Sequence, residues 1–244
     1  MLNMLRFDFY KLTHSKIMRY FWILPVLMWL ISPVSIYLIS NGNESVVKLL
    51  SISYSAPIDI FVFAALFGTR DYASGYMKNI YPSMNKFYYV ASKIIYIFLY
   101  GIIFVLGQFL VASLFNLMKG INLIYDPIID VPLDEFFLAQ AGLVLNRLAI
   151  GAILLFFCAL FKKEHLVIII VAAYYFLLSN VLYNGINAII GNNFDIRPYT
   201  LTAMGSIDSN NLFMDIILPK IIVPACYAVI FLPLDWLIAR VKKV

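Results

Sequence analysis

Long apolar stretches dominate the sequence, and short polar segments separate them. Six stretches are long enough to cross a membrane as helices, because about 20 residues rising ~1.5 Å each span a hydrocarbon core ~30 Å thick. The predicted spans are Phe21–Ser40, Leu49–Phe67, Tyr89–Leu117, Phe136–Phe161, Leu166–Ile190 and Ile216–Ala239. The pattern therefore predicts an all-α, polytopic membrane protein with a single transmembrane domain over residues 1–244.

The residues before the first span predict an amphipathic helix that lies on the membrane surface. Apolar side chains fall on one face of this leader at ~100° per residue, and its basic side contacts anionic headgroups. The apolar face comprises Leu2, Leu5, Phe9 and Leu12. We expect residues 1–20 to be an interfacial helix rather than a cleavable signal, because the apolar run that follows exceeds the 7–15 residues typical of signals. It serves either as an anchor or as a lever between a cytoplasmic partner and the first span.

Composition places the chain in a membrane rather than in water. Hydrophobic residues make up 63% of the sequence and charged residues 13%, whereas soluble domains average about 45–50% and about 25%. A soluble fold of this size cannot bury so much apolar surface in one core.

The charged residues alternate along the six predicted spans. The leader, the second and fourth connections and the C-terminal tail together contain thirteen basic residues and three acidic ones, and the other connections are mainly acidic. Because Lys and Arg sort to the cytoplasmic side, both termini are predicted to be cytoplasmic. The net charge of +5 reflects this sorting, so we expect the lipid membrane, and no nucleic acid, as a partner.

Sequence motifs for nucleotide, metal or acyl chemistry are missing from the chain. It contains no GxxxxGK[ST] loop, no HExxH pair and no GxSxG nucleophile turn. Cys158 and Cys226 lie in apolar runs, and His14 and His165 lie at the ends of spans. We therefore expect no catalytic residue, no metal site and no cofactor bound by this chain itself.

The segment between the second and third spans, residues 69–88, is the most informative connection. It begins as a helical stretch that ends before Pro82, because proline cannot continue a helix. Aromatic residues alternate with small ones, which suits a short helix that inserts into a groove of a partner. The alternative is a solvated loop whose lysines only set the topology.

Asp71 closes the second span, Gly75, Ile80 and Pro82 follow it, and Lys93 opens the third span. With six spans, a basic amphipathic leader and cytoplasmic termini, this pattern resembles the permease subunits of ABC-2 type transporters. The size and the short external loops are most similar to the small permeases of peptide exporters, including lantibiotic-immunity and cytolytic-peptide systems. Asp71 departs mildly from that family, in which the acidic residue is often Glu.

The resemblance implies a permease subunit of an ATP-driven exporter of amphipathic, antimicrobial or toxin peptides in a bacterial cell membrane. Two permeases, identical or related, would assemble with two separate ABC ATPases, which bind the ATP and Mg²⁺. Residues 69–88 would be the coupling segment, with the ATPase contact within 71–86. The implied coupling residues are Asp71, Tyr72, Gly75, Tyr76, Met77, Lys78, Pro82 and Lys86. The alternatives are a non-transporting membrane scaffold or immunity protein, and an intramembrane enzyme.

Polar residues inside the spans are candidates for a translocation path. Asp59 lies in the middle of the second predicted span and Arg147 near the outer end of the fourth. Ionisable residues in lipid face a bundle interior or pair with each other, so an Asp59–Arg147 pair is one hypothesis. We expect Asp59 to serve transport rather than folding, so that Asn at this position folds normally. One face of the fifth span carries Asn180, Asn184 and Asn187, which either bond neighbouring helices or line the path.

Overall fold

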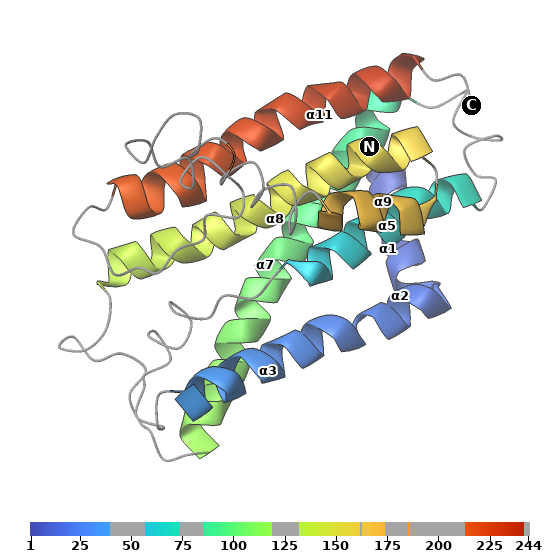
Figure 1. The fold of residues 1–244 in the computed structure, drawn as a ribbon. Helices are drawn as coiled ribbons and strands as arrows, with labels where there is room; N and C mark the ends of the chain where they lie inside the picture. Colours follow the sequence, from blue (N-terminus) through green and yellow to red (C-terminus); the bar gives the residue numbers. More distant parts are fainter. Residues whose placement is uncertain are drawn as a thin grey trace.

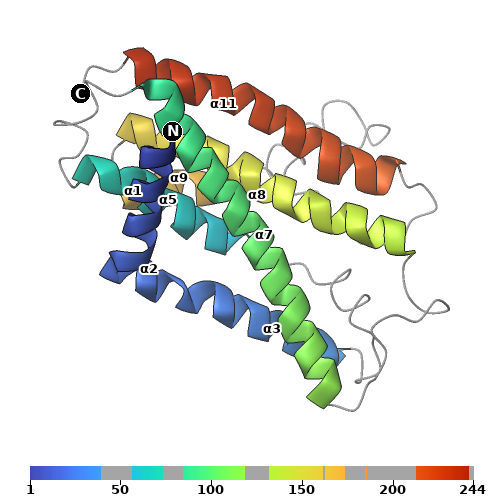
Figure 2. The ribbon, with the colours of Figure 1, turned by 180° about the vertical axis from the view of Figure 1, so that it is seen from behind.

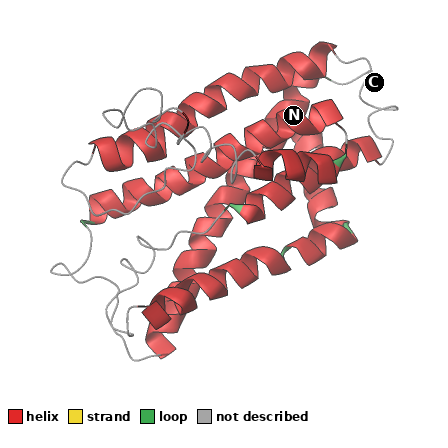
Figure 3. Cartoon of the chain, in the orientation of Figure 1, coloured by secondary structure: helices red, strands yellow, loops and turns green. Residues whose placement is uncertain are grey.

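The computed structural model describes residues 1–39, 57–73, 85–118, 132–161, 163–173, 185 and 213–241. The elements in these ranges are helices (Figures 1 and 3). They are α1 (Leu2–His14), α2 (Lys16–Phe21), α3 (Ile23–Ile39), α5 (Ile58–Ala73), α7 (Lys86–Met118), α8 (Leu133–Phe161), α9 (Glu164–Ala173), the π-helix η4 (Phe213–Ile222) and α11 (Val223–Val241). The predicted all-α class is confirmed.

Three helices in the described part of the chain are long and apolar enough to cross a membrane. They are Lys86–Met118, Leu133–Phe161 and Lys220–Arg240, and each overlaps one of the predicted spans. Three such helices suggest a multi-pass membrane protein. The described parts of the other predicted spans lie mainly in α3, α5 and α9, with Phe21 at the end of α2 and residue 185 outside these helices.

The leader is helical, but it forms two helices rather than one. Ser15 adopts an extended conformation (φ −73°, ψ 126°) between α1 and α2. Its side-chain oxygen accepts a hydrogen bond from the backbone N–H of Met18 at 3.4 Å, so Ser15 is the N-cap of α2. The capping serine therefore ends the first helix and starts the second, and the chain changes direction there (Figure 2).

The position of Arg147 along its helix follows from where that helix begins. Helix α8 begins at Leu133, directly after Pro132, so Arg147 lies halfway along it. Asp134 and Glu135 occupy the first helical turn, where the positive end of the helix dipole stabilises acidic side chains. The helix therefore starts before the first apolar run, and Arg147 lies deep in the bundle.

Helix α8 is the centre of the bundle and packs against α5, α7, α9, η4 and α11. The N-terminus, the C-terminal ends of α5, α8 and α11, and the N-terminal end of α7 lie at one end of the molecule (Figures 1 and 2). The N-terminal ends of α8 and η4 and the C-terminal ends of α3 and α7 lie toward the other end. We call the first of these two ends the basic end of the bundle. It holds the N-terminus, the C-terminal ends of α5, α8 and α11, and the N-terminal end of α7.

Glycine allows the close approach of α8 and η4. A Cβ atom at Gly142 would lie 2.6 Å from Cβ of Lys220 and 2.8 Å from its carbonyl oxygen, both inside normal contact distance. A Cβ at Gly101, where α7 meets α8, would lie 3.4 Å from its nearest neighbour. Small residues of this kind let membrane helices pack closely.

We expect Gly142→Ala to destabilise the protein by roughly 1–3 kcal/mol, the usual penalty for overpacking. The backbone of Lys220 cannot give way as a flexible side chain can. Gly101→Ala is the matched control and should be neutral or slightly stabilising, since alanine favours the helix. Thermal unfolding of both purified variants in one detergent compares them, and equal melting temperatures would contradict the tight contact at Gly142.

Candidate functional site

A cluster of four charged side chains joins three helices at the basic end of the bundle. The charge cluster consists of Asp8 and Lys11 of α1, Asp71 of α5 and Lys93 of α7. The Lys93 ammonium lies 2.7 Å from Oδ1 of Asp8 and 2.8 Å from Oδ2 of Asp71. Lys11 pairs with Asp71 and lies 3.6 Å from Oδ1 of Asp8. Two cations therefore share two carboxylates, and the cluster is neutral.

The cluster is buried, and further groups complete its contacts. The side chains of Asp8, Asp71 and Lys93 are each 1% exposed, and that of Lys11 is 13% exposed. The Tyr89 hydroxyl donates a hydrogen bond to Asp71 at 3.0 Å, and the Ser92 hydroxyl donates one to Asp8 at 2.8 Å. The centre of the Phe67 ring lies 4.1 Å from the Lys93 ammonium. Buried charges persist where such partners replace water.

Burial and neighbouring charges set the protonation of Lys11 in the leader and of Asp71 in α5. Burial, together with the nearby Lys93 ammonium, lowers the pKa of Lys11 to about 8, although Asp71 and Asp8 oppose the shift. Burial disfavours the Asp71 carboxylate, but the charges of Lys93 and Lys11 outweigh it and lower the pKa of Asp71. Asp71 is therefore a stable anion, and Lys11 releases its proton at a lower pH than an exposed lysine.

The cluster connects the leader to both sides of the predicted coupling segment. Asp71 lies in the last turn of α5, and Lys93 lies in the second turn of α7, so the two flank the segment that joins these helices. Asp8 bonds to Lys93 from α1, and the Tyr96 hydroxyl donates to the backbone oxygen of Leu5 at 2.7 Å. Movement of either helix end is thus opposed by the leader.

The predicted coupling residues divide between described and undescribed parts of the chain. Asp71 is buried in the charge cluster, Tyr72 belongs to the last turn of α5, and Lys86 is the first residue of α7. The remaining coupling residues lie outside the described residues, and so do the three asparagines of the fifth span. These are Gly75, Tyr76, Met77, Lys78, Pro82, Asn180, Asn184 and Asn187.

A second buried ion pair lies deeper in the bundle. Nε of Arg147 lies 3.2 Å from Oδ2 of Asp59, and the Tyr100 hydroxyl donates to the same oxygen at 3.1 Å. The Arg147 guanidinium lies 3.7 Å from the centre of the Phe104 ring, a cation–π contact. Asp59 occupies the first turn of the described α5. The structure therefore brings together the two residues whose pairing was one hypothesis, and this pair joins α5, α7 and α8.

Sequence reasoning missed two buried acids, Asp8 and Asp235. Asp8 is the only acid in the leader, and an acid on an otherwise basic helix was the available signal for a partner in the bundle. Asp235 of α11 is 4% exposed, and neither of its carboxylate oxygens has a hydrogen-bond partner among the described residues. It lines a cavity of about 20 Å³ together with Lys93 and Cys158. This volume is about that of one water molecule.

No group of three or more His, Cys, Asp or Glu side chains that could hold a metal ion occurs within the described ranges. A scan against protein-family models finds no match for this chain, and a search of curated proteins finds none. The interpretation of the two charged sites therefore comes from their geometry. Both sites hold helices together through shared carboxylates.

We expect Lys93→Met to destabilise the protein by about 3–5 kcal/mol, the usual effect of removing one partner from a buried ion pair. The variant leaves Asp8 and Asp71 without their shared cation. Lys16→Met on α2, where the lysine is exposed, is the control and should leave stability unchanged. Denaturant unfolding in detergent measures both, and a Lys93→Met protein as stable as the control would show that the cluster does not stabilise the fold.

The Asp59–Arg147 pair changes the expectation for Asp59→Asn, which we now predict to fold less stably. Arginine stays charged in proteins, so this variant leaves a guanidinium buried without its carboxylate. The double variant with Arg147→Met should be more stable, by roughly 0.5–3 kcal/mol, than the sum of the two single losses predicts. A double-mutant cycle of unfolding free energies tests this coupling, and strictly additive effects would contradict it.

Proposed function

We propose that this chain is the permease subunit of an ATP-driven exporter that resembles the ABC-2 type and moves amphipathic peptides. The chain crosses the bacterial cell membrane six times, with α1 and α2 along its cytoplasmic surface and both termini inside. Two permeases form the path, and two separate ATPases bind the ATP and Mg²⁺.

One observation carries the proposal. Asp71 and Lys93 are the two charged positions of the sequence pattern that resembles this family, and they are paired at 2.8 Å in the charge cluster. The pair closes the base of the coupling segment, so that α5 and α7 meet the segment as one unit. A segment held in this way transmits a displacement to both helices, whereas a loop on two independent helices bends without moving them.

The topology also agrees with the arrangement of the helix ends. The leader, the two ends that flank the coupling segment, the end of α8 and the end of α11 all meet at the basic end of the bundle (Figure 1). These are the segments in which the basic residues concentrate. The acidic first turn of α8 lies toward the opposite end. This sorting is what the positive-inside rule requires of a cytoplasmic basic end.

The two buried sites suggest how motion reaches the interior. An ATPase that shifts residues 71–86 pushes on the base formed by Asp71 and Lys93, and α1 moves with them through Asp8. Farther along, Asp59 of α5 contacts Arg147 of α8 and Tyr100 of α7, so the same two helices are joined to α8 at the level of the second pair. A displacement at the surface thus repacks the bundle as a body, and the path between two permeases opens or closes.

A non-transporting scaffold or immunity protein is the second candidate. A rigid cluster would serve such a protein equally well, and the two functions differ in whether a separate ATPase binds and whether ATP drives a peptide across the membrane. ATP-dependent uptake of a labelled amphipathic peptide into inverted vesicles that contain the complex distinguishes them, because a scaffold supports no uptake.

We predict that alanine at Tyr72, Tyr76 and Met77 together weakens co-purification of the ATPase by about 30-fold or more. Truncating one interface anchor typically costs about 2 kcal/mol, which is about 30-fold in affinity. His165→Ala is the matched control, because His165 is exposed near the N-terminal end of α9, on another connection. Purification of the tagged permease from native membranes, followed by ATPase assay, measures the loss. Full ATPase recovery with the triple variant would place the contact elsewhere or show that none exists.

A further inference from the structure

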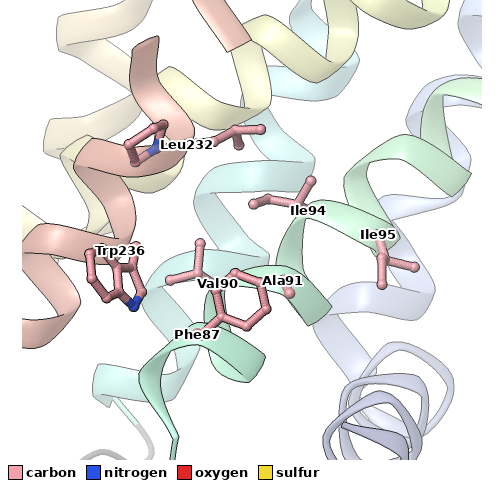
Figure 4. A pocket seen from close by; sticks show the side chains of 8 residues that line it. Phe87, Val90, Ala91, Ile94, Ile95, Leu232 and Trp236 are labelled. Carbon is pink, nitrogen blue, oxygen red and sulfur yellow. The ribbon is translucent and has the colours of Figure 1, made fainter. Parts of the chain in front are cut away.

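An open apolar groove of about 630 Å³ lies between α7 and α11 near the basic end of the bundle (Figure 4). Its walls comprise Phe87, Val90 and Ile94 of α7 and Leu232, Pro233 and Trp236 of α11. The volume falls in the range of roughly 300–1,000 Å³ that holds extended small molecules. Along α7 the lining runs from Phe87 to Ile95, which corresponds to about 12 Å of helix.

Two basic residues lie within one helical turn of the groove lining, toward the basic end. Lys86 precedes Val90 by four residues on α7, and Arg240 follows Trp236 by four residues on α11, so each shares a helix face with a lining residue. The Arg240 guanidinium lies 5.5 Å from the centre of the Trp236 ring. Tyr89 and Val90 pack with Ala239, which holds these two helix ends together. The groove therefore has apolar walls and a cationic rim.

We propose that this groove holds an acyl chain of an anionic phospholipid of the cytoplasmic leaflet, with its phosphate headgroup at Lys86 and Arg240. Apolar walls match the acyl chain, and basic residues at a membrane surface attract anionic headgroups. The proposal needs the two helices to cross the membrane with this end at the cytoplasmic surface. It does not depend on the chain being a permease, so a failure to find an ATPase leaves it intact.

A second copy of the chain fits the groove less well. Copies related by a two-fold axis along the membrane normal present the same surface to each other. Two such grooves would bring two Lys86 and two Arg240 side chains to the same depth. Like charges would then face each other across the contact, whereas an anionic headgroup at the same rim is attracted.

The test uses the full chain reconstituted in phosphatidylcholine vesicles that contain a trace of phosphatidylglycerol with a photoactivatable acyl chain. A matched phosphatidylcholine probe with the same chain measures headgroup selection. We expect the phosphatidylglycerol probe to label peptides that contain 87–95 and 232–236 in preference to the phosphatidylcholine probe. Replacing both rim residues (Lys86→Gln with Arg240→Gln) should reduce that preference by about 30-fold, equivalent to about 2 kcal/mol for two basic residues at the surface.

Two matched variants control for position. Lys16→Gln with Arg19→Gln removes the same number of charges from exposed sites on α2 and should retain the preference. Ala91→Trp fills the groove and should abolish labelling by both probes, whereas Leu99→Trp, at an exposed position of α7 outside the groove, should not. Size-exclusion chromatography shows whether each variant is folded. If the Ala91→Trp protein does not fold, the rim variants still test the lipid proposal.

Three results would overturn the proposal. Equal labelling by the two probes that is insensitive to the rim variants would mean that no headgroup is selected. Labelling that Ala91→Trp leaves unchanged would place the lipid elsewhere. Disulfide formation between two copies that carry Ala91→Cys, in the membrane and at high yield, would identify a second chain as the occupant.

Discussion

The arrangement at the basic end depends on one constraint, the burial of the Lys93 ammonium away from water. A lysine at this depth needs anionic partners, and it finds them on two separate helices, at Asp8 of α1 and Asp71 of α5. The position of α1 therefore depends on the protonation and placement of Asp71 and Lys93, which lie far from it in sequence. Lys11, which is less buried, balances the second carboxylate. Without that second cation, two carboxylates would share a single positive charge.

Apolar periodicity and length were enough to predict the helical fold of the described residues and their three longest helices, because a run of 20 or more apolar residues has few other structures open to it. The sorting of charges along the sequence likewise predicted which helix ends lie together at the basic end. The leader was harder, since its break depends on Ser15, whose hydroxyl caps the second helix. Periodicity alone does not reveal such a local hydrogen bond.

Pairings between helices were the least predictable part of the site. The Asp59–Arg147 contact was one hypothesis because both residues are ionisable and lie in apolar runs. The structure adds that Arg147 lies halfway along α8, which begins at Leu133, directly after Pro132. The contact of Asp8 with Lys93, 85 positions away, was missed altogether, because Asp8 lies in the leader and not in an apolar run, where an ionisable residue predicts a buried partner. The roles of Asp71 and Lys93 were suggested by a family pattern, not by their chemistry.

The separation of these partners has a consequence for how the protein is made. Helix α1 leaves the ribosome before its partners, because Asp71 follows Lys11 by 60 residues and Lys93 follows Asp8 by 85. Until then Asp8 and Lys11 of this helix can pair with each other, at a spacing of three positions. Such a pair is stable in water and at the membrane surface. Helix α1 thus precedes its partners in synthesis, and it reaches its final place only after α5 and α7 have been made.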